Sequence, residues 1–319
     1  MPLAALRVPV AAILALTLAT NACAPGTGPA AQPATKDKLV IAVQPTATPE
    51  TLSANAKELD EFLEKRLGRE VELVFPTTFA GVVESLRFGH AHAAFMSAWP
   101  ARLANKVAGA DVGLAEVREV VIGQEKKAET FYFSYWVVRK DSGITKLEDL
   151  RGKKVAFPSQ LSTSGYVAPL ARLVDLGLVA KPAAGREADP RTFFGTVQFA
   201  GGYQQGWEAL KAGTVDAAII AGDVSESLYR DVLANTTVID QQGPIPSHGV
   251  AFAKQLDAET KRQLKDALLE LGKPEHRPLM RKFISGIFVG FKATTAEEHL
   301  ATLAKYLDTT NLAFVETLR

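Results

Sequence analysis

A short pattern occurs twice in the chain and constrains its fold more than any other feature. Residues 84–94, ESLRFGHAHAA, align without gaps against residues 208–218, EALKAGTVDAA. In each copy a helical stretch ends at a glycine, Gly89 or Gly213, and a short turn leads into a strand. The repetition predicts two lobes of similar α/β construction.

Strands and helices alternate on either side of the first copy. Short β-branched runs predict strands over 39–43, 71–75 and 91–96, and apolar residues at helical spacing predict helices over 50–66 and 80–88. The order β-α-β-α-β favours a parallel sheet with helices on its faces. We therefore expect each lobe to be a mostly parallel sheet flanked by helices.

The second lobe is expected to follow an aromatic strand, Phe131 to Val138. A turn over 140–143, one short helix over 144–152 and a strand over 153–157 come next, and residues 217–221 read as a later strand. Turn residues from Gly243 to Gly249 precede a strand over 250–252 that returns to the first lobe. The predicted division is residues 38–137 plus 250–319 for lobe 1 and 138–249 for lobe 2. Two crossings imply a hinge with a ligand cleft between the lobes.

Three hydroxyl residues and a glycine, Ser162 to Gly165, stand where the 153–157 strand gives way to a helix. Free N–H groups at a helix N-terminus, the helix dipole and short hydroxyl side chains together favour an anion. The alternative is an ordinary Ser/Thr N-cap without a ligand. The segment therefore points to a tetrahedral oxyanion only in the context of the cleft.

The N-terminus carries features of export. Residues 1–22 combine one basic residue, Arg7, with an apolar run from Val8 to Leu18 that is too short to cross a bilayer. Cys23, the single cysteine, follows directly, and residues 23–37 read as a disordered tether. Thr20 and Asn21 depart from the usual lipobox, so lipidation of Cys23 and plain signal-peptidase cleavage are both open.

Charge and composition exclude several partners. The chain has 36 Lys and Arg against 35 Asp and Glu, and removal of residues 1–22 takes away Arg7. The mature chain is therefore almost neutral, which disfavours nucleic acid as a partner. With Cys23 lipidated, no thiol remains for redox or metal chemistry. We expect no cofactor and a monomer.

The chain resembles the solute-binding proteins of phosphate, phosphite and phosphonate ABC transporters, which have the type II periplasmic-binding fold. The resemblance rests on residues 79–89, on residues 147–157, and on Ser162-Thr163-Ser164-Gly165-Tyr166 with Pro169. It implies that the hydroxyls of Ser162, Thr163 and Ser164 and the N–H groups of this segment hold phosphoryl oxygens. It also implies an ABC permease with a cytoplasmic ATPase as partner.

Departures from the family pattern bear on the ligand. Phe79, before Ala80 and Gly81, stands where the family usually has tyrosine, Met96 falls at a second aromatic position, and Gly202 aligns with a histidine. Tyr203 and Gln204 are neighbouring polar candidates. Each lost donor weakens binding of a buried oxyanion by about 1 to 3 kcal/mol. The ligand is thus expected to be a phosphonate, phosphite, phosphate or ester, with a bulkier, more apolar one favoured.

Other polar and aromatic residues have two readings each. His90 and His92 form a metal-like pair but have no accompanying acidic cluster, so a turn is favoured. His248 is interpreted as a turn residue at the hinge. Asp223 either reaches the cleft to bind a ligand amine or caps a helix. The candidates for cleft walls are Trp99, Tyr135, Trp136, Tyr166, Tyr203 and Trp207, of which Trp136 and Trp207 are favoured as core.

The sequence therefore predicts an exported solute-binding protein, in the periplasm or on the outer face of the membrane, that closes on a phosphorus oxyanion. Enzyme motifs are absent: no nucleophile triad, Walker-type loop or dinucleotide fingerprint stands out. Two alternatives remain, one with the same fold and a sulfonate or other small organic ligand, the other a ligand-sensing partner of a membrane receptor.

Overall fold

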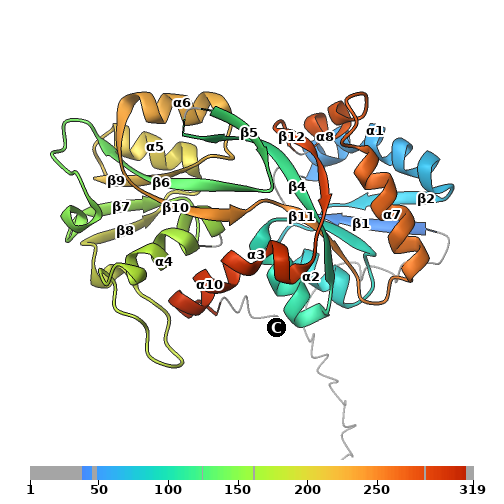
Figure 1. The fold of residues 1–319 in the computed structure, drawn as a ribbon, viewed down its shortest axis with the longest axis horizontal. Helices are drawn as coiled ribbons and strands as arrows, with labels where there is room; N and C mark the ends of the chain where they lie inside the picture. The colour runs from blue at the N-terminus through green and yellow to red at the C-terminus, as the bar shows by residue number, and fades with distance from the viewer. Residues whose placement is uncertain (1–37, 45–48, 124, 161, 284, 314–319) are drawn as a thin grey trace, which may run out of the picture. The chain divides into compact units, whose positions relative to one another are not determined.

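A computed structural model describes residues 38–44, 49–123, 125–160, 162–283 and 285–313. The expected signal peptide, the expected tether and Cys23 lie outside these residues. The described chain forms two sheets (Figure 1). The first has seven strands, ordered β12 (Phe288–Ala293), β4 (Asp111–Ile122), β11 (Gly249–Phe252), β3 (Ala93–Met96), β1 (Lys38–Val43) and β2 (Glu70–Val74), with β5 (Glu125–Glu129) paired to β4.

The second sheet has five strands. Their order is β10 (Thr236–Pro246), β6 (Phe131–Arg139), β9 (Ala217–Ala221), β7 (Lys154–Phe157) and β8 (Thr196–Phe199). The strands predicted from the sequence are all present within two or three residues of their expected bounds.

Helices connect and cover the strands. Those of the first half are α1 (Pro49–Leu67), α2 (Phe79–Arg87), α3 (Ala98–Leu103) and its continuation η1 (Ala104–Ala108). The second-sheet region contains η2 (Leu147–Leu150), η3 (Thr163–Val167), α4 (Ala168–Asp175), η4 (Pro190–Thr192), α5 (Tyr203–Lys211) and α6 (Glu226–Asn235). The C-terminal part contains α7 (Ala258–Glu270), α8 (Arg277–Phe283), α9 (Ala296–His299) and α10 (Ala301–Thr310). The helix expected over 144–152 shortens to the single turn η2.

The repeated pattern has the same structure in both places. Gly89 and Gly213 adopt left-handed backbone conformations, with φ of 73° and 71°, and end α2 and α5 before β3 and β9. The backbone N–H of His92 donates to Val40 O, and that of Asp216 donates to Lys154 O. The side chains of the same two residues accept a second hydrogen bond from the same partners. His92 Nδ1 accepts from Val40 N and Asp216 Oδ2 accepts from Lys154 N, both at 2.9 Å. The similarity of the two halves therefore extends to individual hydrogen bonds.

Each sheet is mixed rather than mostly parallel. Strands β2-β1-β3 and β8-β7-β9 are parallel, as predicted. The remaining pairs, which include β11 with β3 and β6 with β9, are antiparallel. The difference arises because strands contributed by the crossing segments enter each sheet beside the last parallel strand. The two-sheet α/β architecture itself is as expected.

The crossings between the sheets lie close together. The first passes through Thr130, between β5 and β6, and the second through Ser247, between β10 and β11. The N–H of Ser247 donates to Thr130 O at 2.9 Å, and its hydroxyl donates to Glu116 O at 2.5 Å. Residues 131–137, expected in lobe 1, instead pair within the second sheet, so the first crossing precedes the aromatic strand.

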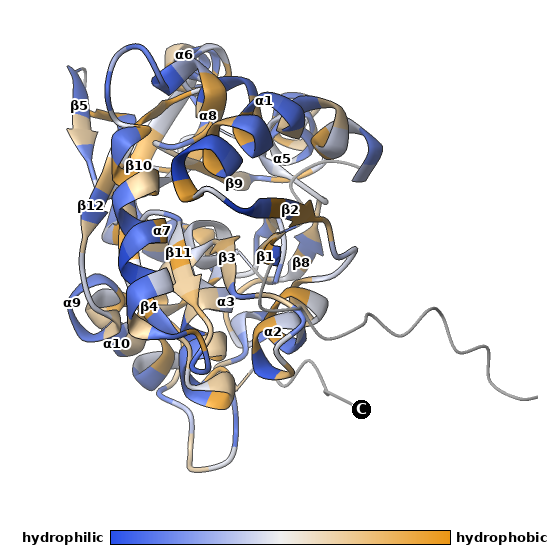
Figure 2. Ribbon diagram, turned by 90° about the vertical axis from the view of Figure 1, so that its right-hand side faces the viewer, coloured by the Kyte–Doolittle hydropathy of each residue, from blue (hydrophilic) through white to orange (hydrophobic). Residues whose placement is uncertain are grey.

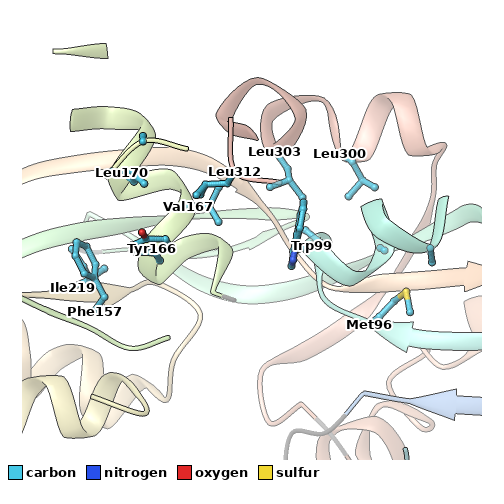
Figure 3. Close-up of a cluster of buried hydrophobic side chains, with 14 of the residues drawn as sticks. Met96, Trp99, Phe157, Tyr166, Val167, Leu170, Ile219, Leu300, Leu303 and Leu312 are labelled. Carbon is cyan, nitrogen blue, oxygen red and sulfur yellow. The ribbon is translucent and has the colours of Figure 1, made fainter. Parts of the chain in front are cut away.

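A third crossing involves the C-terminal helices, which were expected in lobe 1. Helix α10 packs on α4 and β10, and Thr310 O accepts from Ala188 N at 2.8 Å. Figure 3 shows Leu300, Leu303 and Trp99 with Val167 and Leu170, which belong to one buried cluster. Because α9 adjoins β4 while α10 adjoins α4, the C-terminal segment bridges the two sheets.

Two further clusters lie mainly on one sheet each, although Val121 of β4 joins the cluster of the second sheet. One cluster packs α1, α7 and α8 against the first sheet through Leu59, Leu63, Leu264, Leu268 and Phe283. In Figure 2, strands β3 and β11 are hydrophobic and α7, in front of them, is mainly hydrophilic. Another cluster lies under α5 and α6, around Trp207 and Tyr229. None of the helices in the described part of the chain is both long and apolar enough to cross a bilayer.

Candidate functional site

A cavity of about 360 Å³ opens where both sheets present the carboxyl ends of their strands. This is the edge at which open α/β sheets bind ligands. The lining residues from the first sheet are Gln44, Phe79, Ser97 and Ala98. Those from the second sheet and the crossings are Tyr132, Ser159, Ser162, Thr163, Ser164, Gly201, Tyr203, Asp223, Pro246 and His248.

The first-sheet wall combines polar and apolar groups. Gln44 directly follows β1 and is buried, and its Oε1 accepts from Ser97 N at 2.6 Å. The Gln44 amide nitrogen, which can only donate, is thereby left for another partner. Ser97 precedes α3 but makes no side-chain capping bond. Phe79 opens α2 and, with Ala98, supplies the apolar part of this wall.

The hydroxyl segment is fixed by a close packing contact. Ser162 is the N-cap of η3, and its Oγ accepts from Gly165 N at 2.9 Å. A Cβ at Gly165 would lie 2.0 Å from Pro158 Cγ, so only glycine allows η3 to approach the end of β7. Ser162 is thus both a capping residue and a wall of the cavity. Capping and ligand contact do not exclude one another here.

Two tyrosines connect the hydroxyls. Tyr203 OH lies 2.6 Å from Ser164 Oγ and 3.3 Å from Ser162 Oγ, and Tyr132 OH donates to Ser164 Oγ at 3.1 Å. Burial, together with the Asp223 charge, raises the pKa of Tyr132 and of Tyr203. Both phenols therefore keep their protons and remain hydrogen-bond donors.

Asp223 follows β9 and belongs to a buried group of three charges. Arg118 Nη1 donates to Asp223 Oδ2 at 2.9 Å, and its Nη2 donates to Glu116 Oε2 at 3.0 Å. The side chains of Arg118 and Glu116 are 7% and 5% exposed. Burial raises the pKa of Asp223, and Arg118 opposes this increase. The alternative of a helix cap is wrong, since Ser225 caps α6.

His248 lines the cavity from the second crossing. Burial, with the nearby charges of Arg118 and His299, holds the pKa of His248 well below its usual value. The ring is therefore neutral at physiological pH. Its neighbour Ser247 accepts at its carbonyl from His299 Nε2, at 3.0 Å. The expectation of a turn residue was incomplete, because His248 occupies the turn and also faces the cavity.

The structure brings together six of the eleven expected ligand residues: Phe79, Ser162, Thr163, Ser164, Tyr203 and Asp223. Met96 is 1% exposed within the core, and Ser97 takes its place at the cavity. Ala80 and Gly81 continue α2 beyond Phe79, and Gly165 packs on Pro158. Gly202 does not line the cavity, whereas its neighbour Gly201 does. These five residues are not among those that line the cavity.

Other candidates have structural places. Of the aromatic residues considered for cleft walls, Tyr203 lines this cavity, whereas Trp99, Tyr135, Trp136, Tyr166 and Trp207 are core residues. His92 Nδ1 accepts a hydrogen bond from Val40 N and is therefore not available to a metal ion. The interpretation of the histidine pair as a turn is the one that remains. Among the described residues no group of three or more His, Cys, Asp or Glu could hold a metal ion.

Sequence reasoning missed Gln44, Ser97, Tyr132 and the Arg118–Glu116 pair. Gln44 and Ser97 each follow a predicted strand, so the rule that ligands lie at strand carboxyl ends could have found them. Arg118 and Glu116 are two apart on one strand and thus share a face, but nothing local marks the approach of Asp223.

The two mixed sheets, the adjacent crossings and the cavity at the strand ends define a type II periplasmic-binding-protein fold. The sequence matches the family described as ABC transporter, phosphonate, periplasmic substrate-binding protein over residues 41–299. The chain belongs to this family.

A curated relative and solved structures agree. The chain is 33% identical over 206 residues to the phosphate-import protein PhnD of Mycolicibacterium smegmatis. The aligned residues make up 64% of this chain and 59% of that protein. It is similar in fold to a binding protein component of an ABC phosphonate transporter from Pseudomonas aeruginosa, with TM-score 0.63, 19% identity and coverage of 88% and 90%.

Two further structures share the fold. PhnD1 of Prochlorococcus marinus, solved with methylphosphonate, has TM-score 0.62 and 14% identity and covers 86% of this chain and 98% of its own. A Xanthomonas citri protein solved with ATP has TM-score 0.67 and 18% identity, with coverage of 87% and 99%. At these identities the likeness concerns the fold.

Proposed function

We propose that the protein works outside the cytoplasm, where it captures a phosphorus oxyanion that still has one acidic proton. It then delivers this ligand to an ABC permease with its ATPase. The single observation that carries this proposal is the composition of the cavity wall. Many neutral donors line it, the one charged lining side chain is the Asp223 carboxylate, and none of the described lining residues is Lys or Arg.

The carboxylate limits which anions fit. A fully ionised oxyanion beside Asp223 would suffer like-charge repulsion in a poorly solvated site. A ligand with a P–OH group instead donates its proton to Asp223 and accepts at its other oxygens. Sulfate and sulfonates have no such proton at neutral pH, so they fit less well.

The donors match the remaining oxygens. The Tyr203 phenol, the hydroxyls of Ser162 to Ser164 and the Gln44 amide surround the same space, and Tyr132 supports them by donating to Ser164 Oγ. The first N–H groups of η3 add donors at a helix start. Phe79, Ala98 and Pro246 give an apolar side to the cavity, which suits an organic substituent on phosphorus.

Capture involves closure of two lobes. Contacts from both sheets to one ligand favour the closed arrangement, and a permease that recognises this arrangement receives loaded protein. The adjacent crossings at Thr130 and Ser247 support a hinge. The protein would act as a monomer. A lipid on Cys23 would hold it at the outer face of the membrane.

The test is a calorimetric titration of the purified protein. Phosphate, phosphite and methylphosphonate are compared with sulfate and methanesulfonate at neutral pH. We expect at least one phosphorus oxyanion to bind and both sulfur anions to bind at least about a hundredfold more weakly, equivalent to about 2.7 kcal/mol. Preference for methanesulfonate would replace the proposal with the sulfonate alternative.

A further inference from the structure

We propose that Arg118 is a positioning residue that holds Asp223 as the ionised carboxylate that selects a protonated phosphorus oxyanion. The inference rests on the proposed function and adds a residue that does not itself line the cavity. Arg118 bonds to Asp223, which follows β9, and the backbone N–H of its strand neighbour Glu116 donates to His248 O in the second crossing, at 2.8 Å.

Its geometry connects the two sheets. Arg118 and Glu116 share a face of β4 in the first sheet, whereas Asp223 follows β9 in the second. The same end of β4 contacts the second sheet through Val121 N, which donates to Gly222 O at 3.3 Å. The bond from Arg118 to Asp223 therefore fixes the carboxylate at the base of the cavity.

The group is poorly arranged if its purpose is stability alone. Two carboxylates share one guanidinium, and Glu116 Oε1 and Arg118 Nε are buried without a hydrogen-bond partner among the described residues. Buried charges with unmet polar atoms cost stability, so such a group calls for another explanation. Selection of the ligand's protonation state is such an explanation.

The charged and titratable neighbours all bear on this selection. Asp223 faces Arg118 and Glu116 from β4, Tyr132 from β6 and Tyr203 from α5. Arg118 and Tyr132 favour the ionised carboxylate, whereas burial and Glu116 disfavour it. His248 faces Arg118 and His299, and both disfavour the imidazolium. Arg118 is the cation common to both residues.

Removal of Arg118 changes selectivity rather than affinity alone. Without the guanidinium, burial and Glu116 raise the pKa of Asp223 further, so more of the carboxyl is protonated at neutral pH. A protonated Asp223 donates a hydrogen bond and accepts a fully ionised anion. The variant should therefore lose discrimination against anions that carry no proton.

The experiment measures methylphosphonate and methanesulfonate binding, an isosteric pair that differs in the acidic proton. In Arg118→Met we expect the ratio of their dissociation constants to fall at least about tenfold, the effect of one pKa unit at Asp223. The acidic limb of methylphosphonate binding should move to higher pH by about one unit or more. Arg118→Lys, which keeps a cation, should restore most of the ratio.

Controls separate selection from a loss of structure. Arg172→Met removes another Arg–Asp pair, to Asp240, outside the cavity, and should leave the ratio unchanged. If Arg118→Met does not fold, the double variant Glu116→Gln/Arg118→Met is measured instead, because it also removes the Glu116 charge that has lost its cation. Equal weakening of both ligands, with an unmoved pH profile, overturns the inference alone. Failure of the unmodified protein to prefer methylphosphonate overturns the proposed function as well.

Discussion

The hydroxyl oxygens of Ser164 and Tyr203 lie 2.6 Å apart, although the two residues open different helices. Ser164 is the second residue of η3, which leads into α4, and Tyr203 is the first residue of α5. The contact brings the ends of β7 and β8 to a common point on the cavity wall. Hydroxyls already joined in this way need little reorganisation to receive an oxyanion.

Tyr203→Phe tests this contact. The variant keeps the ring and removes the hydroxyl bonded to Ser164 and Ser162. We expect ligand affinity to fall about tenfold, in line with about 1.4 kcal/mol for a lost hydrogen bond to a charged group. Calorimetry measures the change, and Tyr229→Phe, on the buried face of α6, is the matched control. Equal affinities for Tyr203→Phe and the unmodified protein would remove Tyr203 from the site.

Ser162→Ala combined with Thr163→Ala should abolish detectable binding of the phosphorus oxyanion. Loss of the Ser162 cap on Gly165 N also lowers the free energy of unfolding by about 1 kcal/mol. Ser225→Ala, which removes the cap of α6 outside the cavity, should cost similar stability without affecting binding. Chemical denaturation and calorimetry on both variants separate the two effects, and retained binding in the double variant would contradict the assignment.

Gly165→Ala should distort the site. The new methyl group would meet Pro158 at 2.0 Å and Ser162 Oγ at 2.8 Å, which forces η3 away from the end of β7. We expect a loss of about 1 to 3 kcal/mol in stability, together with greatly weakened binding. Gly206→Ala, in α5 with nothing near its Cβ, should instead stabilise by about 1 kcal/mol. Thermal unfolding compares the pair; similar melting temperatures would refute the packing argument.

Phe79→Tyr restores a hydroxyl at the cavity wall. If the new hydroxyl reaches a ligand oxygen, affinity for methylphosphonate rises by up to about tenfold. The same hydroxyl makes the wall less apolar and should weaken binding of phosphonates with larger organic groups. Titration with methylphosphonate and phenylphosphonate gives the change in preference. An unchanged preference would mean that position 79 does not contact the ligand.

The half-buried, neutral histidines His248 and His299 should make stability depend on pH. The pKa of His248 and that of His299 are lowered in the folded state, mainly by burial. Unfolding lets each ring bind a proton below about pH 6.5, so the free energy of unfolding falls as pH decreases from there, by about 1.4 kcal/mol per pH unit for each ring. His248→Gln should remove one ring's share of that slope. Denaturation curves between pH 7 and 5 measure it, and identical slopes would argue against a neutral, half-buried His248.

The parallel core of both sheets could be predicted because it depends on local pattern. The alternation of strands and helices and the glycines after α2 and α5 specify β2-β1-β3 and β8-β7-β9. The antiparallel strands could not be placed, since β11 and β6 pair with partners far away in sequence. Strand Phe131 to Val138 reads equally well in either sheet.

The hydroxyl segment and Asp223 were predictable from the sequence, whereas the Arg118–Glu116 pair that binds Asp223 and the approach of His248 to the cavity were not. Ser162 to Ser164 form one continuous segment after a strand, so their place at the cavity follows from the local sequence. Arg118 reaches Asp223 across 105 positions of the chain, and His248 turns toward the cavity only because the crossings meet. Such contacts depend on the tertiary arrangement of the two sheets.

Helix α10 covers α4 and β10, and these elements are synthesised long before it. Leu170, Leu303 and Leu312 belong to one buried cluster, so that part of the second sheet's apolar surface lacks its cover until the last helix has emerged. Folding of the region around the hydroxyl segment is therefore completed late in synthesis. A chain built in this order remains incompletely folded while it is being made, which is the condition in which a polypeptide can be threaded through a membrane before it acquires its final form.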